Sequence, residues 1–336
     1  MTQKFEKVGI IGAGSWGTAL AQTISLTTPD VKILARNDDL AKEINSNHTN
    51  ERYLGDIELH DSITATIEFQ DVAENSEVLF LVTPAQHMRN ALKKIKPYLS
   101  EDKPLVICSK GIEISSGKLM SDVLREVVPE NPYLVLSGPN FAHEVAKGLP
   151  AAATLATTAN AGIGKKVAHT MFSKTFRPYV TSDPVGAEIG GAVKNVIAIA
   201  CGIVYGYELG ENAKAAIMTR GMAEIKRMGK ILGARSETFL GLSGLGDLTL
   251  TCNSMSSRNF SLGVARGRGE SLNEILAKRH NVTEGVATAS AILDFAKKHA
   301  VDMPICQAVN DTLHEGVTVQ QTVEALLSRP LTQESL

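Results

Sequence analysis

The chain has few of the features that mark a secreted or metal-binding protein. Its 336 residues include only four cysteines, which lie far apart and form no Cys-x-x-Cys pair. This spacing argues against a disulfide framework and favours reduced thiols in the cytoplasm. The eight histidines are scattered without metal-ligand spacing, so we expect no metal.

An excess of charge of one sign is also absent, because 34 lysines and arginines oppose 36 aspartates and glutamates. Such a balance gives no global attraction for nucleic acid or a membrane surface, so any anion site must be local. No long apolar segment of the secretory kind opens the chain, and no window approaches a transmembrane span. We therefore expect a cytoplasmic protein that binds no nucleic acid and inserts into no membrane.

The length exceeds that of a usual single domain, and the chain has no internal repeat and no low-complexity linker. The first half alternates short apolar runs with helical patterns, which is typical of an α/β fold with a parallel sheet. From Asp183-Pro184 onward, long Ala-, Gly- and Leu-rich segments have helical spacing. We predict a Rossmann-type, mostly parallel sheet domain over residues 1–183 and an all-α domain over residues 184–336, packed firmly together.

The expected strands are Val8–Ile11, Val31–Ala35, Val78–Val82, Leu105–Cys108, Tyr133–Leu136, Ala152–Thr157 and Thr175–Val180. The expected helices of the second domain are Val185–Tyr205, Asn212–Leu232, Leu272–Lys278, Thr288–His299, Ile305–Glu315 and Thr322–Leu327. Ligands of open α/β sheets bind beyond the carboxyl ends of the strands, so the turns after these strands are the expected site.

A glycine-rich turn, GAGSWG, follows the first expected strand and runs from Gly12 to Gly17. Gly12 would allow a tight turn, Gly14 would let a pyrophosphate approach the backbone, and Gly17 would let the next helix pack closely on the strand. The free N–H groups of that helix would then face the phosphates. The alternative is a glycine-rich turn without a ligand, but the order of strand, turn and helix favours a dinucleotide site.

The residue after the second expected strand bears on the choice of cofactor. Arg36 cannot accept a hydrogen bond from a ribose 2′-hydroxyl but can pair with a 2′-phosphate, so we expect NADP(H) to be accepted. Asp38 and Asp39 lie close to the end of this strand, where an acidic residue could bind the ribose of NAD, so NAD also remains an expected cofactor. A solvated surface arginine is the alternative interpretation.

Lys194 lies in an expected helix of otherwise small apolar residues, GGAVKN from Gly190 to Asn195. Burial lowers the pKa of a lysine, and an amine that titrates near neutrality can both give and take the proton that accompanies hydride transfer. The alternative is a side chain whose ammonium group reaches water along the helix surface. The spacing alone does not decide between the two.

A second dense group of polar residues lies between Gly241 and Asn259. Its glycines predict a flexible loop, in which Asp247 supplies a carboxylate. Ser257, Arg258 and Asn259 then supply a hydroxyl, a guanidinium and an amide, which together suit a phosphate. A polar loop with a helix cap at Ser256 or Ser257 would contain the same residue types.

Six segments, in order along nearly the whole chain, resemble bacterial NAD(P)-dependent glycerol-3-phosphate dehydrogenase. They are GAGSWGTA from Gly12, SKGIE from Ser109, LSGPNFA from Leu136, GAVKNV from Gly191, GLGDLT from Gly244 with the later Ser257-Arg-Asn259, and VTEG from Val282. The resemblance implies a Rossmann-type domain followed by an all-α domain, a fold of the 6-phosphogluconate-dehydrogenase-like kind. It also implies reversible reduction of dihydroxyacetone phosphate to sn-glycerol 3-phosphate with NADP or NAD, for phospholipid synthesis.

The resemblance further implies which residues bind and react. Cofactor contacts would come from the glycine turn and from Ser15, Trp16, Arg36, Tyr53, Lys110, Ala142, Arg258, Val282 and Glu284. Substrate contacts would come from Lys110, Gly138, Asn140, Lys194, Asp247, Ser257, Arg258 and Asn259. Lys194 would donate and accept the proton, Lys110 would add positive potential, and Asp247 would orient Lys194 or a substrate hydroxyl. Asn140 and Tyr53 depart from the commonest residues of the family.

Two other functions fit part of these observations. A 3-hydroxyacid or ketopantoate-reductase-like dehydrogenase has a similar plan with a lysine-centred site, and a non-catalytic redox sensor would need only the nucleotide site. The Ser109-Lys-Gly turn and the Ser257-Arg-Asn segment favour a phosphorylated three-carbon substrate. Helical domains rich in small residues often pack across a two-fold axis, so we expect a homodimer.

Overall fold

A computed structural model describes residues 4–279, 283–330 and 333. The chain forms two compact units, which we call the sheet unit (Met1–Ser109 and Met120–Pro184) and the helical unit (Lys110–Leu119 and Val185–Leu336). The main division lies one residue after the expected boundary. Assigning Lys110–Leu119 to the first domain was wrong, because Ile112 and Leu119 are buried in the core of the helical unit.

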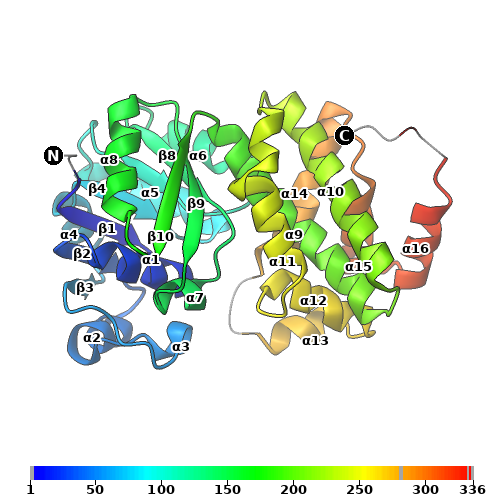
Figure 1. Cartoon of the computed structure of the whole chain (residues 1–336), viewed down its shortest axis with the longest axis horizontal. Helices are drawn as coiled ribbons and strands as arrows, with labels where there is room; N and C mark the ends of the chain where they lie inside the picture. Colours follow the sequence, from blue (N-terminus) through cyan, green and yellow to red (C-terminus); the bar gives the residue numbers. More distant parts are fainter. Residues whose placement is uncertain (1–3, 280–282, 331–332, 334–336) are drawn as a thin grey trace. The chain divides into compact units, whose positions relative to one another are not determined.

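The sheet unit contains an eight-stranded sheet in the order β10-β9-β8-β5-β4-β1-β2-β3 (Figure 1, blue to green). All neighbouring strands are parallel except β8 and β9, which are antiparallel. The strands are β1 (Lys7–Ile11), β2 (Asp30–Leu34), β3 (Ile63–Thr66), β4 (Val78–Leu81), β5 (Leu105–Ile107), β8 (Tyr133–Ser137), β9 (Ala151–Ala156) and β10 (Phe176–Thr181). The prediction of a mostly parallel sheet is confirmed.

The strand order reverses between β1 and β4, which is where an open α/β sheet offers a crevice for a ligand. The pairing of Ile11 with Leu81 brings the carboxyl ends of these two strands level with each other. All four residues of β4 and all three of β5 are buried, as expected for a sheet covered on both faces. The ends of these central strands therefore lie on a rigid support.

Helices of the sheet unit form two groups, since α1 contacts α7 and α8 whereas α5 contacts α4 and α6. The helices are α1 (Ser15–Ser25), α2 (Asp38–Asn47), α3 (Glu51–Leu54), α4 (Phe69–Glu74), α5 (Ala85–Ile95), the 3-10 turn η1 (Lys96–Tyr98), α6 (Met120–Val127), α7 (Ala142–Ala146) and α8 (Ala161–Met171). The sequence did not predict β3, because its only apolar residues are Ile63 and Ala65.

The helical unit contains α9 (Pro184–Gly206), α10 (Glu211–Ile231), the 3-10 turn η2 (Ser236–Leu240), the π-helical turn η3 (Leu242–Gly246), α11 (Asp247–Cys252), α12 (Arg258–Gly267), α13 (Leu272–Ala277), α14 (Glu284–His299), α15 (Pro304–His314) and α16 (Val319–Leu327). A short antiparallel pair, β6 (Ile112–Glu113) and β7 (Lys118–Leu119), packs with these helices. The C-terminal region is helical as predicted, and the hairpin joins it from the first half of the chain.

Glycines allow α9 and α12 to approach closely. A Cβ atom at Gly202 would lie 2.1 Å from the carbonyl oxygen of Phe260, and one at Gly263 would lie 2.1 Å from that of Ile199. Backbones can meet at such distances only where no side chain intervenes. The contact holds the first turn of α12 in a fixed position relative to α9, which carries Lys194.

By length and composition α9 could cross a membrane, so the prediction that no window approaches a transmembrane span was wrong. Every residue of its apolar window is buried inside the protein. The apolar surface of α9 is therefore satisfied by the core of the helical unit, where Val193, Ile197 and Cys201 are fully buried.

Candidate active site

The glycine turn after β1 has the geometry that the sequence predicts. Gly12 has a φ of +123°, in the region that favours glycine. A Cβ atom at Gly17 would lie 1.9 Å from the carbonyl oxygen of Gly12, so only glycine lets α1 start this close to the strand. No atom lies within 4 Å of a Cβ placed at Gly14. The turn is closed at its two outer glycines and open at the middle one.

The first turn of α1 offers backbone donors beside that open position. Thr18 N donates to Gly14 O at 2.9 Å, and the amides of Ser15, Trp16 and Gly17 have no partner among the residues that the structure describes. Asn50 holds the turn, since its Nδ2 donates to Ala13 O at 3.1 Å. Free amides and the positive end of the helix dipole are suited to an anion such as a pyrophosphate.

The other expected cofactor residues of the sheet unit lie after β2 and on two short helices, α3 and α7. Arg36 follows β2, is exposed, and has no partner in the described part of the chain. Tyr53 lies on α3 with the guanidinium carbon of Arg52 5.6 Å from its ring centre. Ala142 begins α7, which contacts α1. A basic residue thus lies next to Tyr53.

Gly138 and Asn140 follow β8. A Cβ atom at Gly138 would lie 2.9 Å from the Cα of Ala153, so the backbone there admits no side chain. Asn140 Nδ2 donates to Ala152 O at 3.1 Å, while its Oδ1 is buried with no partner among the described residues. A buried acceptor without a donor is costly, and a ligand N–H or O–H would satisfy it.

One carboxylate joins the two candidate lysines inside the helical unit. Lys194 Nζ donates to Asp247 Oδ1 at 2.5 Å, and Lys110 Nζ donates to Asp247 Oδ2 at 2.6 Å. Exposed fractions of these side chains are 9% for Lys194, 1% for Asp247 and 20% for Lys110. The alternative that Lys194 reaches water is therefore wrong. Two ammonium groups around one carboxylate leave a net positive charge, which can stabilise an anion that develops beside them.

Lys194 has the titration behaviour of a proton donor and acceptor. Burial lowers the pKa of its amine, the charge of Asp247 raises it, and the charge of Lys110 lowers it, to a final pKa of about 8. The ordinary value is 10.5. A pKa this close to neutrality allows both protonation states to be reached at little cost.

Thr251 completes the surroundings of Lys194, and no motif in the sequence pointed to it. Its Oγ1 accepts a hydrogen bond from Lys194 Nζ at 2.7 Å and donates to Asp247 O at 2.6 Å. Asp247 and Thr251 lie four residues apart on α11 and so share one face of the helix. That spacing was the available signal. The prediction of a flexible loop from Gly241 to Asn253 was wrong, because η3 and α11 form a continuous helical segment there.

Ser257, Arg258 and Asn259 form the N-terminus of α12. Ser257 is the N-cap, and its Oγ accepts from Phe260 N at 3.2 Å. The interpretation as a helix cap is correct, yet it leaves the hydroxyl proton of Ser257 available to a ligand. The N-terminus of a ten-residue helix with serine, arginine and asparagine side chains is suited to a phosphate.

Glu284 begins α14. Val282 lies outside the described residues. No group of three or more His, Cys, Asp or Glu side chains that could hold a metal occurs in the described part of the chain.

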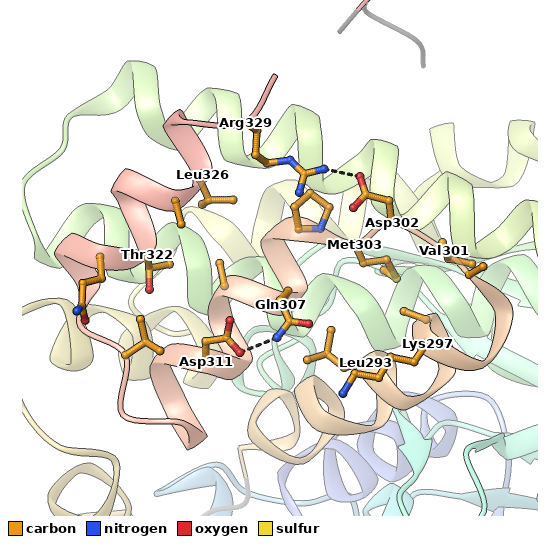
Figure 2. Close-up of a pocket in the computed structure, with 17 residues that line it drawn as sticks. Leu293, Lys297, Val301, Asp302, Met303, Gln307, Asp311, Thr322, Leu326 and Arg329 are labelled. Carbon is orange, nitrogen blue, oxygen red and sulfur yellow. Dashed lines mark hydrogen bonds and ion pairs between the residues drawn. The ribbon is translucent and has the colours of Figure 1, made fainter. Parts of the chain in front are cut away.

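A pocket of about 530 Å³ lies among α14, α15 and α16 (Figure 2). Its wall includes Leu293, Met303 and Leu326, the ion pair of Arg329 with Asp302, and the hydrogen bond of Gln307 to Asp311. None of the expected site residues lines it. Its volume therefore does not identify the place of the chemistry.

Comparison with known proteins identifies the family. The model of the NAD-dependent glycerol-3-phosphate dehydrogenase N-terminus matches residues 7–162, and the model of the C-terminus matches residues 183–324. The chain belongs to this family. The glycerol-3-phosphate dehydrogenase [NAD(P)+] of Parvibaculum lavamentivorans is 49% identical over 100% of both chains. The crystal structure of glycerol-3-phosphate dehydrogenase from Coxiella burnetii is 34% identical, with a TM-score of 0.92, and covers 96% of this chain and 99% of its own.

More distant structures share the fold alone. A probable 2-dehydropantoate 2-reductase from Bacillus subtilis is 16% identical with a TM-score of 0.57 over 91% of this chain and 98% of its own. The similar plan expected for ketopantoate reductases is therefore found. In this glycerol-3-phosphate dehydrogenase family member, the choice of substrate must come from the site rather than from the fold.

Proposed function

We propose that the protein catalyses the reversible reduction of dihydroxyacetone phosphate to sn-glycerol 3-phosphate with NADPH or NADH. The observation that carries this proposal is the buried arrangement in which Lys110 and Lys194 share Asp247. The N-terminus of α12 lies in the same unit and would supply groups that bind the phosphate. The family membership supports the same reaction.

The sheet unit would hold the cofactor, and the helical unit would hold most of the substrate site. The open position at Gly14 and the unpaired amides at the start of α1 fit a pyrophosphate. Arg36 would pair with a 2′-phosphate. The remaining proposed cofactor contacts are Tyr53, Lys110, Ala142, Arg258, Val282 and Glu284. The nicotinamide, when bound, supplies the hydride.

Lys194 would supply the proton in the reduction. Negative charge grows on the carbonyl oxygen as the carbon is reduced, and a fixed ammonium group within hydrogen-bond reach stabilises it. Lys194 then transfers its proton to that oxygen and becomes neutral, and the reverse reaction returns the proton. Asp247 and Thr251 would orient the amine, and Lys110 would add positive potential.

Substrate specificity would rest on the phosphate. Ser257, Arg258 and Asn259 would bind it at the start of α12, where both side-chain and backbone donors are available. Gly138 and Asn140 are further proposed substrate contacts, and the unpaired Oδ1 of Asn140 would accept a hydrogen bond from a hydroxyl group.

We further propose that the protein is a cytoplasmic homodimer that supplies glycerol phosphate for phospholipid synthesis. The four cysteines, all within the described residues, form no disulfide and are buried, which fits a reducing compartment. Tyr205 and Tyr207 at the end of α9 are 48% and 42% exposed, and aromatic side chains on a surface suit a protein interface. Measurement of the mass in solution by light scattering tests the oligomeric state.

A direct assay tests the reaction. Purified protein is mixed with NADPH or NADH and either dihydroxyacetone phosphate or dihydroxyacetone, and the loss of nicotinamide absorbance is followed. We expect rapid oxidation with the phosphorylated ketone and a much lower kcat/KM without the phosphate. Absence of oxidation by folded protein that binds the nucleotide would contradict the proposed substrate.

A further inference from the structure

Two asparagine side chains connect α9, α12 and α14 through three hydrogen bonds. Asn195 Nδ2 donates to Gly191 O at 3.3 Å, and Asn259 Nδ2 donates to Asn195 Oδ1 at 2.9 Å. The amide of Gly285 then donates to Asn259 Oδ1 at 3.0 Å. Asn195 is 5% exposed and Asn259 is 8% exposed. All four residues belong to the helical unit.

Backbone groups fix the direction of this chain of hydrogen bonds. The carbonyl oxygen of Gly191 can only accept, so Asn195 turns its Nδ2 toward it and its Oδ1 toward Asn259. The amide of Gly285 can only donate, so Asn259 must turn its Oδ1 toward Gly285. Both ends therefore require the same orientation of the Asn259 amide, with Nδ2 toward Asn195.

The orientation leaves one donor of Asn259 for a ligand. An amide nitrogen carries two hydrogens, and only one of those on Nδ2 is used by a partner in the described residues. Rotation of the amide by 180° would place Oδ1 where Nδ2 now lies. A carbonyl oxygen repels a phosphate, whereas an N–H donates to it, so the orientation decides whether Asn259 helps or hinders binding of an anion.

We propose that Asn195 is a positioning residue, which orients Asn259 toward the substrate phosphate with the help of Gly285. This inference rests on the proposed function, because it assumes that the phosphate lies at the start of α12. Asn195 itself needs no contact with the substrate for this role. Its position directly after Lys194 on α9 links the proton donor and the phosphate site to one helix.

Gly285 is required by the same arrangement. A Cβ atom there would lie 2.5 Å from Asn259 Oδ1 and 2.9 Å from Asn195 O. The backbone oxygen of Asn195 cannot move without moving α9, so the Asn259 amide would have to rotate away. Gly285→Ala therefore disturbs Asn259 from the side opposite to Asn195, while it keeps every polar side chain.

The experiment compares Asn195→Ala with Asn310→Ala as a matched control. Asn310 is a buried asparagine of the same unit, 7% exposed, and its Oδ1 accepts from Ser290 Oγ at 3.1 Å outside the proposed site. KM and kcat are measured with dihydroxyacetone phosphate and with dihydroxyacetone, together with the inhibition constant of inorganic phosphate against the phosphorylated ketone.

For Asn195→Ala, we expect KM for dihydroxyacetone phosphate and the inhibition constant of phosphate to rise by about 10- to 100-fold, as for loss of a hydrogen bond to a charged group. We expect kcat/KM for dihydroxyacetone to change less than about threefold, a difference that a merely structural defect would not produce. Asn310→Ala should leave the ratio between the two ketones as it is in the unchanged protein.

Equal losses for the two ketones, or an unchanged inhibition constant of phosphate, would overturn the proposal. If Asn195→Ala does not fold, Gly285→Ala is measured in the same way, and the same outcomes decide. If the unchanged protein fails to distinguish the two ketones, the proposed function itself is wrong. If the unchanged protein distinguishes the two ketones, and Asn195→Ala and Gly285→Ala distinguish them to the same degree, only the positioning role of Asn195 is wrong.

Discussion

Lys194 Nζ lies 2.5 Å from Asp247 Oδ1, and both side chains are buried. The charge of Asp247 raises the pKa of Lys194, whereas that of Lys110 lowers it. In the proposed direction of ketone reduction, Lys194 would have to be protonated to supply the proton. The rate of reduction should therefore fall as the pH rises through about 8, the pKa of Lys194.

Substitutions of Asp247 and of Lys110 should shift the pH at which the rate of reduction falls, and the two shifts should have opposite directions. Asp247→Asn removes a negative charge and should shift the fall in kcat/KM to lower pH by roughly one unit or more. Lys110→Met removes a positive charge and should shift it to higher pH. Profiles of kcat/KM against pH for the three proteins provide the check. Shifts in the same direction would show that another group controls the rate.

Two glycines of the turn after β1 should respond differently to the same substitution. Gly17→Ala places a Cβ atom 1.9 Å from Gly12 O and should destabilise the protein by about 1–3 kcal/mol. Gly14→Ala meets no atom within 4 Å and should unfold at the same denaturant concentration as the unchanged protein, yet bind nucleotide more weakly. Trp16 is the single tryptophan and lies in this turn, so its fluorescence can report the binding. Unaltered affinity in Gly14→Ala would place the pyrophosphate elsewhere.

Arg36→Ala should change the affinity for NADPH and the affinity for NADH to different extents. Loss of a partner for the 2′-phosphate should weaken NADPH by about 10-fold or more and leave NADH nearly unchanged, because only NADPH carries that group. Dissociation constants from the same fluorescence titration give the ratio. A similar loss for both cofactors would mean that Arg36 acts on the fold or on a part common to the two.

The buried carboxyl group of Glu224, in the helical unit, should make the free energy of unfolding depend on pH. It is 1% exposed and accepts from Ile305 N at 2.6 Å and from Cys306 N at 3.1 Å. Burial raises its pKa from 4.5 to about 7, and these backbone donors oppose the rise. The folded state thus holds the proton more tightly than the unfolded chain. The contribution of Glu224 to stability is complete below pH 4.5 and is lost as the pH rises to about 7.

Glu224→Gln removes this titration. The free energy of unfolding of the unchanged protein, relative to that of the variant, should decrease between pH 4.5 and 7 by up to about 1.4 kcal/mol per pH unit. Urea unfolding at several pH values measures the difference. The exposed Glu237→Gln serves as the control for the loss of one carboxylate from the same unit. A constant difference for Glu224→Gln would mean that the carboxyl group titrates alike in both states.

Local patterns were sufficient to predict most of the sheet unit. Apolar runs such as Val78–Leu81 identify buried strands whichever strands they pair with. The glycine turn can likewise be recognised from six consecutive residues. The sequence did not reveal β3, whose short alternation of Ile63 and Ala65 is not distinctive. It also did not reveal α11, which has only six residues, or α12, in which glycine and serine weaken a helical pattern that contacts with α9 then stabilise.

Contacts between distant residues account for what the sequence could not show in the site. Lys110 and Asp247 are 137 residues apart, and only the packing of the β6–β7 hairpin with the helical unit brings them together. The sequence left open whether Asp247 orients Lys194 or a substrate hydroxyl, and the structure shows its carboxylate accepting from both lysines. Thr251 and Asn195 lacked any signal stronger than their spacing from Asp247 and Lys194.

The central claim is that Lys194 transfers the proton in the reduction of dihydroxyacetone phosphate. The most direct test is the turnover of Lys194→Ala in the nicotinamide absorbance assay, with NADPH binding measured in the same preparation through Trp16 fluorescence. We expect a kcat lower by about 10³-fold or more, with nucleotide affinity within a few-fold of that of the unchanged protein. Near-normal turnover by this variant would contradict it.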